Sequence, residues 1–238
     1  MATTQTSPNR TARRPMFVGW MQVRPSLPRP SPAVPIAAAA ASLLAFAALA
    51  AEVREDRTLA IDRTILRVLE PHYFDQPAHA VALVLLGATG DWFAPLPLLI
   101  VVAIGIALLA SGRRGDALFL VLAAFGAALT SYLLKPLFPQ PGLHLGADSR
   151  SYFPSGHAMG SITVVAAVVL LNWHRRYRFA LLAAGGVFVF VYGAALVFLR
   201  EHYPSDVLAG WCLGAAWISV LWLCFSAARR PTGLRSSG

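Results

Sequence analysis

Charged residues are scarce in this chain of 238 residues. They make up 13% of it, against roughly a quarter of an ordinary soluble domain, while 57% of the residues are hydrophobic. Lysine is almost absent, because Lys135 is the single lysine among the 20 basic residues. This composition argues against a water-soluble globule and favours a membrane protein.

Cysteine is also scarce. The two cysteines, Cys212 and Cys224, lie in one apolar stretch, about 18 Å apart along a helix, which is too far for a disulfide bond. They therefore indicate nothing about a redox compartment. The sequence also has no internal repeat, no heptad pattern and no nucleotide-binding glycine loop.

Long apolar runs, by contrast, are abundant. Six windows of 18 to 23 residues contain no Lys, Arg, Asp or Glu. About 20 apolar residues in a helix cross the hydrocarbon core of a bilayer, where a helix satisfies its own backbone hydrogen bonds. We therefore predict an all-α fold, a polytopic membrane protein built as a bundle of six transmembrane helices. The windows are 30–51, 92–112, 117–134, 151–173, 179–199 and 207–228.

The basic residues gather on one side of the predicted membrane. That side holds 13 basic residues and one acidic residue, Asp116, whereas the opposite side holds 7 basic and 10 acidic residues. By the positive-inside rule both termini are cytoplasmic, and the segments 52–91, 135–156 and 200–206 face outward at the cell membrane. The net charge of +9 thus reflects membrane orientation and not nucleic-acid binding. The predicted partners are the lipid bilayer and a membrane lipid.

The predicted domain organisation is simple. Residues 1–33 form a flexible basic cytoplasmic tail, residues 34–228 a single six-helix membrane domain, and residues 229–238 a second cytoplasmic tail. Ala48-Leu49-Ala50 resembles a signal peptidase site, although the Pro-rich leader is long for a signal peptide. The stretch 57–70 predicts an amphipathic helix on the outer surface, either a packed connector or an element of lipid entry.

Titratable residues occur at the predicted outer ends of four helices. Because charged groups near a bilayer cost free energy, they are candidates for function. With both termini inside, all of them reach the same outer face. They are Lys135, the Ser155-Gly156-His157 segment, Arg200, and His202 with Asp206.

The segment Phe153-Pro154-Ser155-Gly156-His157 precedes an apolar helix. Ser155 at the N-cap and the small Gly156 leave backbone N–H groups at the positive end of the helix dipole, which predicts an anion site. His157 on the first turn could then bind a phosphate oxygen or protonate a leaving group. The alternative is a simple helix cap with an interfacial histidine.

The segment His202-Tyr203-Pro204-Ser205-Asp206 opens the last helix. A histidine and an aspartate four residues apart can face each other, so that the carboxylate fixes the imidazole tautomer and leaves Nε2 as a nucleophile or base. A helix-capping pair is the alternative. No third ligand at a recognisable spacing joins them, so we predict neither a metal nor another cofactor. The Lys135 ammonium group could bind a phosphate as a point charge; alternatively, it only anchors the end of its helix at the membrane interface.

Together these segments resemble the type-2 phosphatidic acid phosphatase superfamily, which includes lipid phosphate phosphatases and vanadium haloperoxidases. The resemblance covers about residues 55–226. It implies that His202 attacks phosphorus to form a phosphohistidine, that Asp206 supports His202, and that His157 protonates the leaving group. It also implies that Lys135, Ser155 and Gly156 hold phosphate oxygens.

Two arginines of the family pattern are missing. Gly142 and Leu143 replace an Arg-Pro pair, and Ala195 and Leu196 replace a Ser-Arg pair. Losing one preorganised donor to a transition-state oxyanion costs roughly 3 to 4 kcal/mol. Arg200, one helical turn beyond Leu196, or Arg150, shortly before Ser155, could supply the charge; alternatively, Arg200 pairs with Glu201 or anchors its helix.

The predicted function is therefore hydrolysis of a lipid phosphate or pyrophosphate, of the polyprenyl diphosphate or phosphatidate type, by a membrane phosphatase. A lipid phosphotransferase acting on phosphodiester head groups is the first alternative, because a diester carries less charge and needs fewer cations. A non-enzymatic lipid-binding or transport protein with a disarmed site is the second.

Overall fold

The computed structural model describes residues 31–55, 60–87, 95–138 and 153–228, and throughout these ranges its regular elements are helices. In chain order they are α1 (Ala33–Arg54), α2 (Ala60–Leu69), the short 3-10 helix η2 (Glu70–His72), α3 (Gln76–Gly87), α4 (Pro95–Ala110), α5 (Arg114–Leu134), η3 (Lys135–Leu137), α6 (Gly156–Leu171), α7 (Arg178–Phe198) and α8 (Pro204–Ala228). The all-α prediction is confirmed for this part of the chain.

Each of the six uncharged windows overlaps one of these helices. Four helices, α1, α5 with η3, α7 and α8, are long and apolar enough to cross a membrane, whereas α4 and α6 have 16 residues each. Six spans therefore stay a prediction. Helix α3 was not predicted, because its 12 residues are too few for a span.

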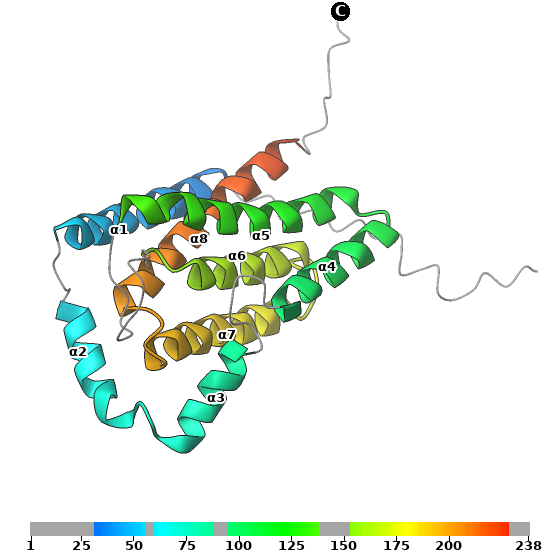
Figure 1. Cartoon of the computed structure of the whole chain (residues 1–238). Coiled ribbons are helices and arrows are strands. Elements are labelled where there is room, and N and C mark those ends of the chain that lie inside the picture. The colour runs from blue at the N-terminus through cyan, green and yellow to red at the C-terminus, as the bar shows by residue number, and fades with distance from the viewer. Residues whose placement is uncertain (1–30, 56–59, 88–94, 139–152, 229–238) are drawn as a thin grey trace, which may run out of the picture.

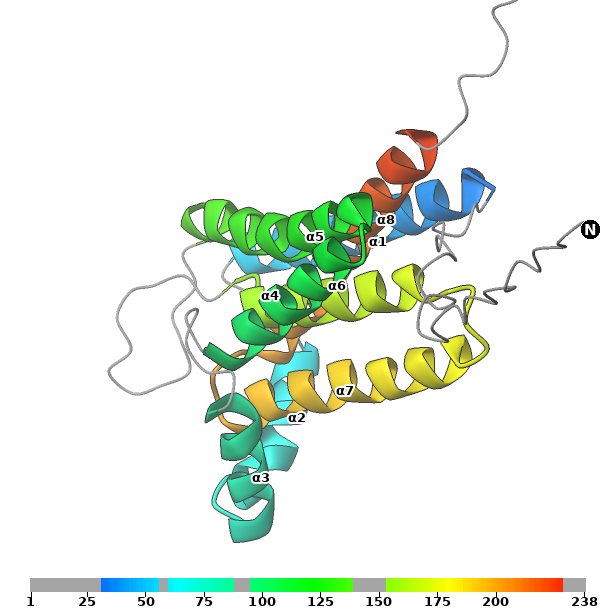
Figure 2. The ribbon, with the colours of Figure 1, turned by 90° about the vertical axis from the view of Figure 1, so that its right-hand side faces the viewer.

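The helices pack as a bundle around α8. In both Figure 1 and Figure 2, α5, α6 and α7 lie in successive layers, and α3 packs beyond α7. Helix α8 contacts α1, α5, α6 and α7. Figure 1 shows α2 at the end of the bundle where α7 ends and α8 begins, which is also where α6 begins. The ends of three helices thus meet beside α2.

The contact between α6 and α8 depends on two glycines one helical turn apart. A Cβ atom added to Gly210 would lie 2.4 Å from the Ser155 carbonyl oxygen, and one added to Gly214 would lie 2.8 Å from the Met159 carbonyl oxygen. Residues four apart share one face of a helix, and small residues there let two backbones approach closely. The glycines therefore set how near α8 comes to the start of α6.

Substituting Gly210 tests this packing. We expect Gly210→Ala to lower the free energy of unfolding by about 1 to 3 kcal/mol, because the added methyl group meets a backbone oxygen that cannot rotate away. Gly160→Ala on α6 is the matched control, since nothing lies within 4 Å of a Cβ atom there. Thermal unfolding in detergent measures both variants, and equal melting temperatures would contradict the close crossing.

Candidate active site

The start of α6 is held by its own serine and by α8. Ser155 is the N-cap, as predicted, and its Oγ accepts a hydrogen bond of 3.3 Å from the Ala158 N–H. The Ser155 N–H donates to the Asp206 carbonyl oxygen at 3.1 Å. Gly156 is the first residue of α6, and His157 follows it on the first turn. The two predicted motifs are therefore joined through their backbones.

The end of α7 carries the chain round to His202. The Arg200 N–H donates to the Val197 carbonyl at 3.0 Å and the Glu201 N–H to the Leu196 carbonyl at 2.9 Å, the pair of bonds that defines a Schellman motif. Arg200 takes the left-handed position of this motif with φ of 60°, where glycine is usual. The turn fixes the point from which His202 approaches α8.

His202 and Asp206 face each other, as the spacing predicted. The His202 Nδ1 atom lies 3.3 Å from Asp206 Oδ2, which also accepts a 3.0 Å hydrogen bond from the Tyr203 N–H. Both side chains are buried, with Asp206 fully covered. The second carboxylate oxygen, Oδ1, has no hydrogen-bond partner among the described residues. A buried carboxylate thus orients one imidazole nitrogen and leaves Nε2 for other contacts.

The second histidine lies opposite the first. The ring centroids of His157 and His202 are 6.4 Å apart, and the His157 ring also packs edge-on against Tyr192. Lys135, half-buried in η3, is close enough to Asp206 for their charges to attract. The structure therefore brings together Lys135, His157, His202 and Asp206, which the sequence separates by up to 71 positions.

The structure corrects the predicted place of Arg200. Helix α7 ends at Phe198, so Arg200 does not continue the helical face of Leu196. Its guanidinium carbon lies instead 5.1 Å from the ring centroid of Tyr73, which follows η2, a cation–π contact. Leu196 is 1% exposed within an apolar cluster. The left-handed turn is the physical cause, because it reverses the chain before Arg200 completes another helical turn.

Several expectations fall outside the described residues. Arg150, the other candidate for the missing charge, is one of them, as are Gly142 and Leu143. Among the described residues, no three His, Cys, Asp or Glu side chains are grouped so as to hold a metal ion. Metal-free chemistry stays a prediction.

Asp62 is a buried carboxylate beside the candidate site that was not predicted from the sequence. Helix α2 is amphipathic, as predicted, yet Asp62 is 2% exposed and lies on the helical stripe of Ile65, Leu66 and Leu69. Its Oδ1 accepts a 2.8 Å hydrogen bond from the Ser205 N–H, and its Oδ2 accepts one of 2.8 Å from the Ser205 hydroxyl. The spacing in the sequence could have indicated this burial. Asp62 precedes the three apolar residues by three, four and seven positions, and these spacings place it on the same buried face of the helix.

Burial and neighbouring charges shape the ionisation of two groups outside the spans. Burial raises the pKa of Asp62, and the nearby Asp206 carboxylate raises it further, whereas the hydrogen bonds from Ser205 oppose the shift. Burial also raises the pKa of the Tyr203 phenol, with Asp206 and Asp62 adding to the effect and Arg200 opposing it. Tyr203 is therefore protonated at neutral pH.

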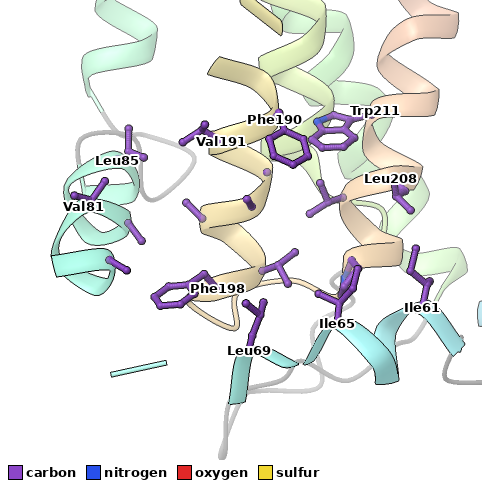
Figure 3. A pocket seen from close by; sticks show the side chains of 18 of the residues that line it. Ile61, Ile65, Leu69, Val81, Leu85, Phe190, Val191, Phe198, Leu208 and Trp211 are labelled. Atoms are coloured by element: carbon purple, nitrogen blue, oxygen red, sulfur yellow. The ribbon is translucent and has the colours of Figure 1, made fainter. Parts of the chain in front are cut away.

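An apolar cavity of about 750 Å³ adjoins this end of the bundle. Figure 3 shows its walls: Ile61, Ile65 and Leu69 from α2, Val81 and Leu85 from α3, Phe190, Val191 and Phe198 from α7, and Leu208 and Trp211 from α8. Pro204 and Val207, which flank Ser205 and Asp206, also line it. An apolar cavity thus borders the first turn of α8.

The fold defines an α-helical membrane protein whose helix ends gather two histidines, an aspartate and a lysine. The chain matches the model of the PAP2 superfamily over residues 2–230 and belongs to that superfamily. No curated protein matches it. Among solved structures it is similar to the first transmembrane PAP2-type phosphatidylglycerolphosphate phosphatase from Bacillus subtilis. The TM-score is 0.64 and the identity 21%, over 82% of this chain and 98% of that one, a likeness in fold.

Proposed function

We propose that the chain is a membrane phosphatase that hydrolyses a lipid phosphate or pyrophosphate through a phosphohistidine. The facing pair of imidazoles, one of them oriented by a buried carboxylate, carries the proposal. Membership of the PAP2 superfamily and the phosphatase activity named for the similar Bacillus structure support it.

In the first step His202 Nε2 attacks phosphorus while the bond to the leaving oxygen breaks. Asp206 accepts the Nδ1–H hydrogen bond and stabilises the positive charge that develops on the ring. His157 gives its proton to the departing oxygen. In the second step His157 takes a proton from water, whose oxygen attacks phosphorus and displaces His202.

The surroundings of the pair suit a lipid phosphate. Lys135 and the backbone N–H groups at the start of α6 supply positive charge at this end of the bundle, and Ser155 and Gly156 shape that helix start. The adjoining apolar cavity is within the roughly 300 to 1,000 Å³ of ligand pockets and suits a hydrocarbon chain. A polyprenyl diphosphate or a phosphatidate combines both parts.

We propose further that residues 34–228 form six spans between cytoplasmic tails, with the site facing outward. In this orientation a lipid in the outer leaflet reaches the cavity and the two histidines from the same side. Cleavage at Ala48-Leu49-Ala50 would remove most of α1, which packs against α8, so we propose an uncleaved chain.

Matched substrates test the chemistry. We expect His202→Ala to abolish phosphate release from a lipid phosphate and from p-nitrophenyl phosphate alike, because both need the nucleophile. His157→Gln removes the acid of the first step and the base of the second, so it should lower kcat by about a hundredfold or more on both substrates. Because nitrophenolate leaves without a proton, this variant should still release one equivalent of nitrophenol in a rapid first turnover, whereas His202→Ala should release none. The wild-type reaction should proceed with chelator present and be inhibited by vanadate.

Three outcomes would contradict this mechanism. Activity lost to a chelator and restored by a divalent ion would replace the phosphohistidine with metal chemistry. Transfer of a phospho-head-group between lipids, with no release from monoesters or pyrophosphates, would establish the phosphotransferase alternative. Inactivity in both assays would leave a lipid-binding protein.

Arg200 is the described arginine proposed to replace the missing phosphate contacts. Arg200→Gly removes the guanidinium and relaxes the left-handed backbone, whereas Arg200→Ala removes the guanidinium and keeps the strain. We expect both variants to lose about thirtyfold in kcat/KM, equivalent to about 2 kcal/mol. The glycine variant should be more stable than the alanine variant by about 1 to 2 kcal/mol.

The exposed Arg63 on α2 supplies the control, and Arg63→Ala should leave kcat/KM within twofold. Full activity of Arg200→Gly would show that the arginine serves only its contact with Tyr73. The same variants, purified in detergent, yield both the activity and the melting temperature.

Cysteine labelling tests the orientation. In a background with Cys212 and Cys224 replaced by alanine, Ser151→Cys should react with a membrane-impermeant maleimide in intact cells. Ser111→Cys, at the end of α4, should react only after permeabilisation, because the positive-inside rule places it in the cytoplasm. The reverse pattern would invert the topology and place the site inside.

A further inference from the structure

The contact between Asp62 and Ser205 joins α2 to the helix that carries Asp206. One carboxylate accepts both donors of Ser205, its N–H and its hydroxyl, each at 2.8 Å. The two residues are 143 positions apart, and both are buried. This contact ties the outermost turn of α8 to an element outside the membrane-length helices.

The first turn of α8 is thereby held from three directions. Ser205 is fixed by Asp62, the Asp206 carbonyl accepts from the Ser155 N–H on the α6 side, and Asp206 Oδ2 accepts from Tyr203. Pro204 opens the helix and has no N–H of its own to offer. Without Asp62, the turn is held on the α6 side and by its own loop only. It could then rotate and carry Asp206 Oδ2 away from His202.

Stability alone does not account for a carboxylate at this position. Ionised Asp62 is buried near a second carboxylate, Asp206, and a carboxyl group whose pKa is raised on folding opposes folding once it ionises. Below its unfolded pKa the group has no such cost; the cost grows as the pH rises from the unfolded pKa to the folded pKa and is constant above it. What Asp62 contributes is acceptance of both Ser205 donors at one point.

We propose that Asp62 is a positioning residue for the His202–Asp206 pair: by binding both donors of Ser205 it fixes the first turn of α8 and so the distance between His202 Nδ1 and Asp206 Oδ2. This proposal rests on the proposed phosphatase function. It assigns to α2 a role in the reaction beyond forming a wall of the cavity with Ile61, Ile65 and Leu69.

A pair of substrates separates positioning from cavity shape. If Asp62 orients the catalytic pair, Asp62→Ala should lower kcat by about ten- to a hundredfold on a lipid phosphate and on p-nitrophenyl phosphate, as expected for a misplaced catalytic group. KM for the lipid should change less than twofold. If Asp62 only shaped the cavity, the lipid KM would rise and the chain-free substrate would be unaffected, which would overturn the proposal.

Conservative variants and a double-mutant cycle sharpen the test. In Asp62→Asn the amide oxygen still accepts from the Ser205 N–H, and the amide NH2 group donates to the Ser205 hydroxyl oxygen. We therefore expect kcat to stay within about threefold of wild type. Ser205→Ala removes only the hydroxyl bond and should cost about three- to tenfold in kcat. Asp62→Ala combined with Ser205→Ala should be no slower than Asp62→Ala alone, because the two residues act through one contact.

The control carboxylate is Asp75, which is exposed and paired with His72 in the same outer segment. Asp75→Ala should leave kcat within twofold. Should Asp62→Ala fail to fold, Ser205→Ala decides the matter, and wild-type kcat in that variant would overturn the proposal. Wild-type kcat in folded Asp62→Ala would do the same. An inactive wild type on every phosphate would instead refute the proposed function, so the two failures are distinguishable.

Discussion

The close crossing of α6 and α8 is the packing constraint on which the site depends. Gly210 and Gly214 let the backbone of α8 approach the Ser155 and Met159 carbonyls more closely than any side chain would permit. That approach allows the Ser155 N–H to bond to the Asp206 carbonyl and brings His157 opposite His202. The placement of His157 opposite His202 thus depends on glycine, which has no Cβ atom, at positions 210 and 214.

Around this crossing, hydrogen bonds orient the groups that the packing brings together. The Schellman motif after α7 places His202, Asp206 holds its ring, and Asp62 holds the turn that carries Asp206. The contacts of Asp206 with His202 and of Asp62 with Ser205 are buried, so water does not compete for them and each is stronger than it would be at the surface. The supporting contacts therefore come from the turn after α7 and the first turns of α6 and α8, each of which by itself resembles an ordinary helix end.

The two arginines expected from the family pattern are absent from this chain. Leu196, at one of those two positions, packs into an apolar cluster in α7. Arg200, the nearest described arginine in sequence, packs over Tyr73. Under the proposed function, Lys135 and the start of α6 supply positive charge to the phosphate, and Arg200 adds to it from the loop before α8.

The sequence by itself determined the features that depend on local spacing. Apolar windows predicted the membrane-length helices, Ser155 was predicted as an N-cap, and four-residue spacing predicted that His202 and Asp206 face each other. Only the tertiary structure decided the rest. Arg200 has a left-handed backbone conformation and so leaves the helical face of Leu196. Asp62 bonds to Ser205, which is 143 positions away in the sequence. Helical periodicity predicts neighbours within one helix, but contacts between helices depend on crossing distance and on where each turn redirects the chain.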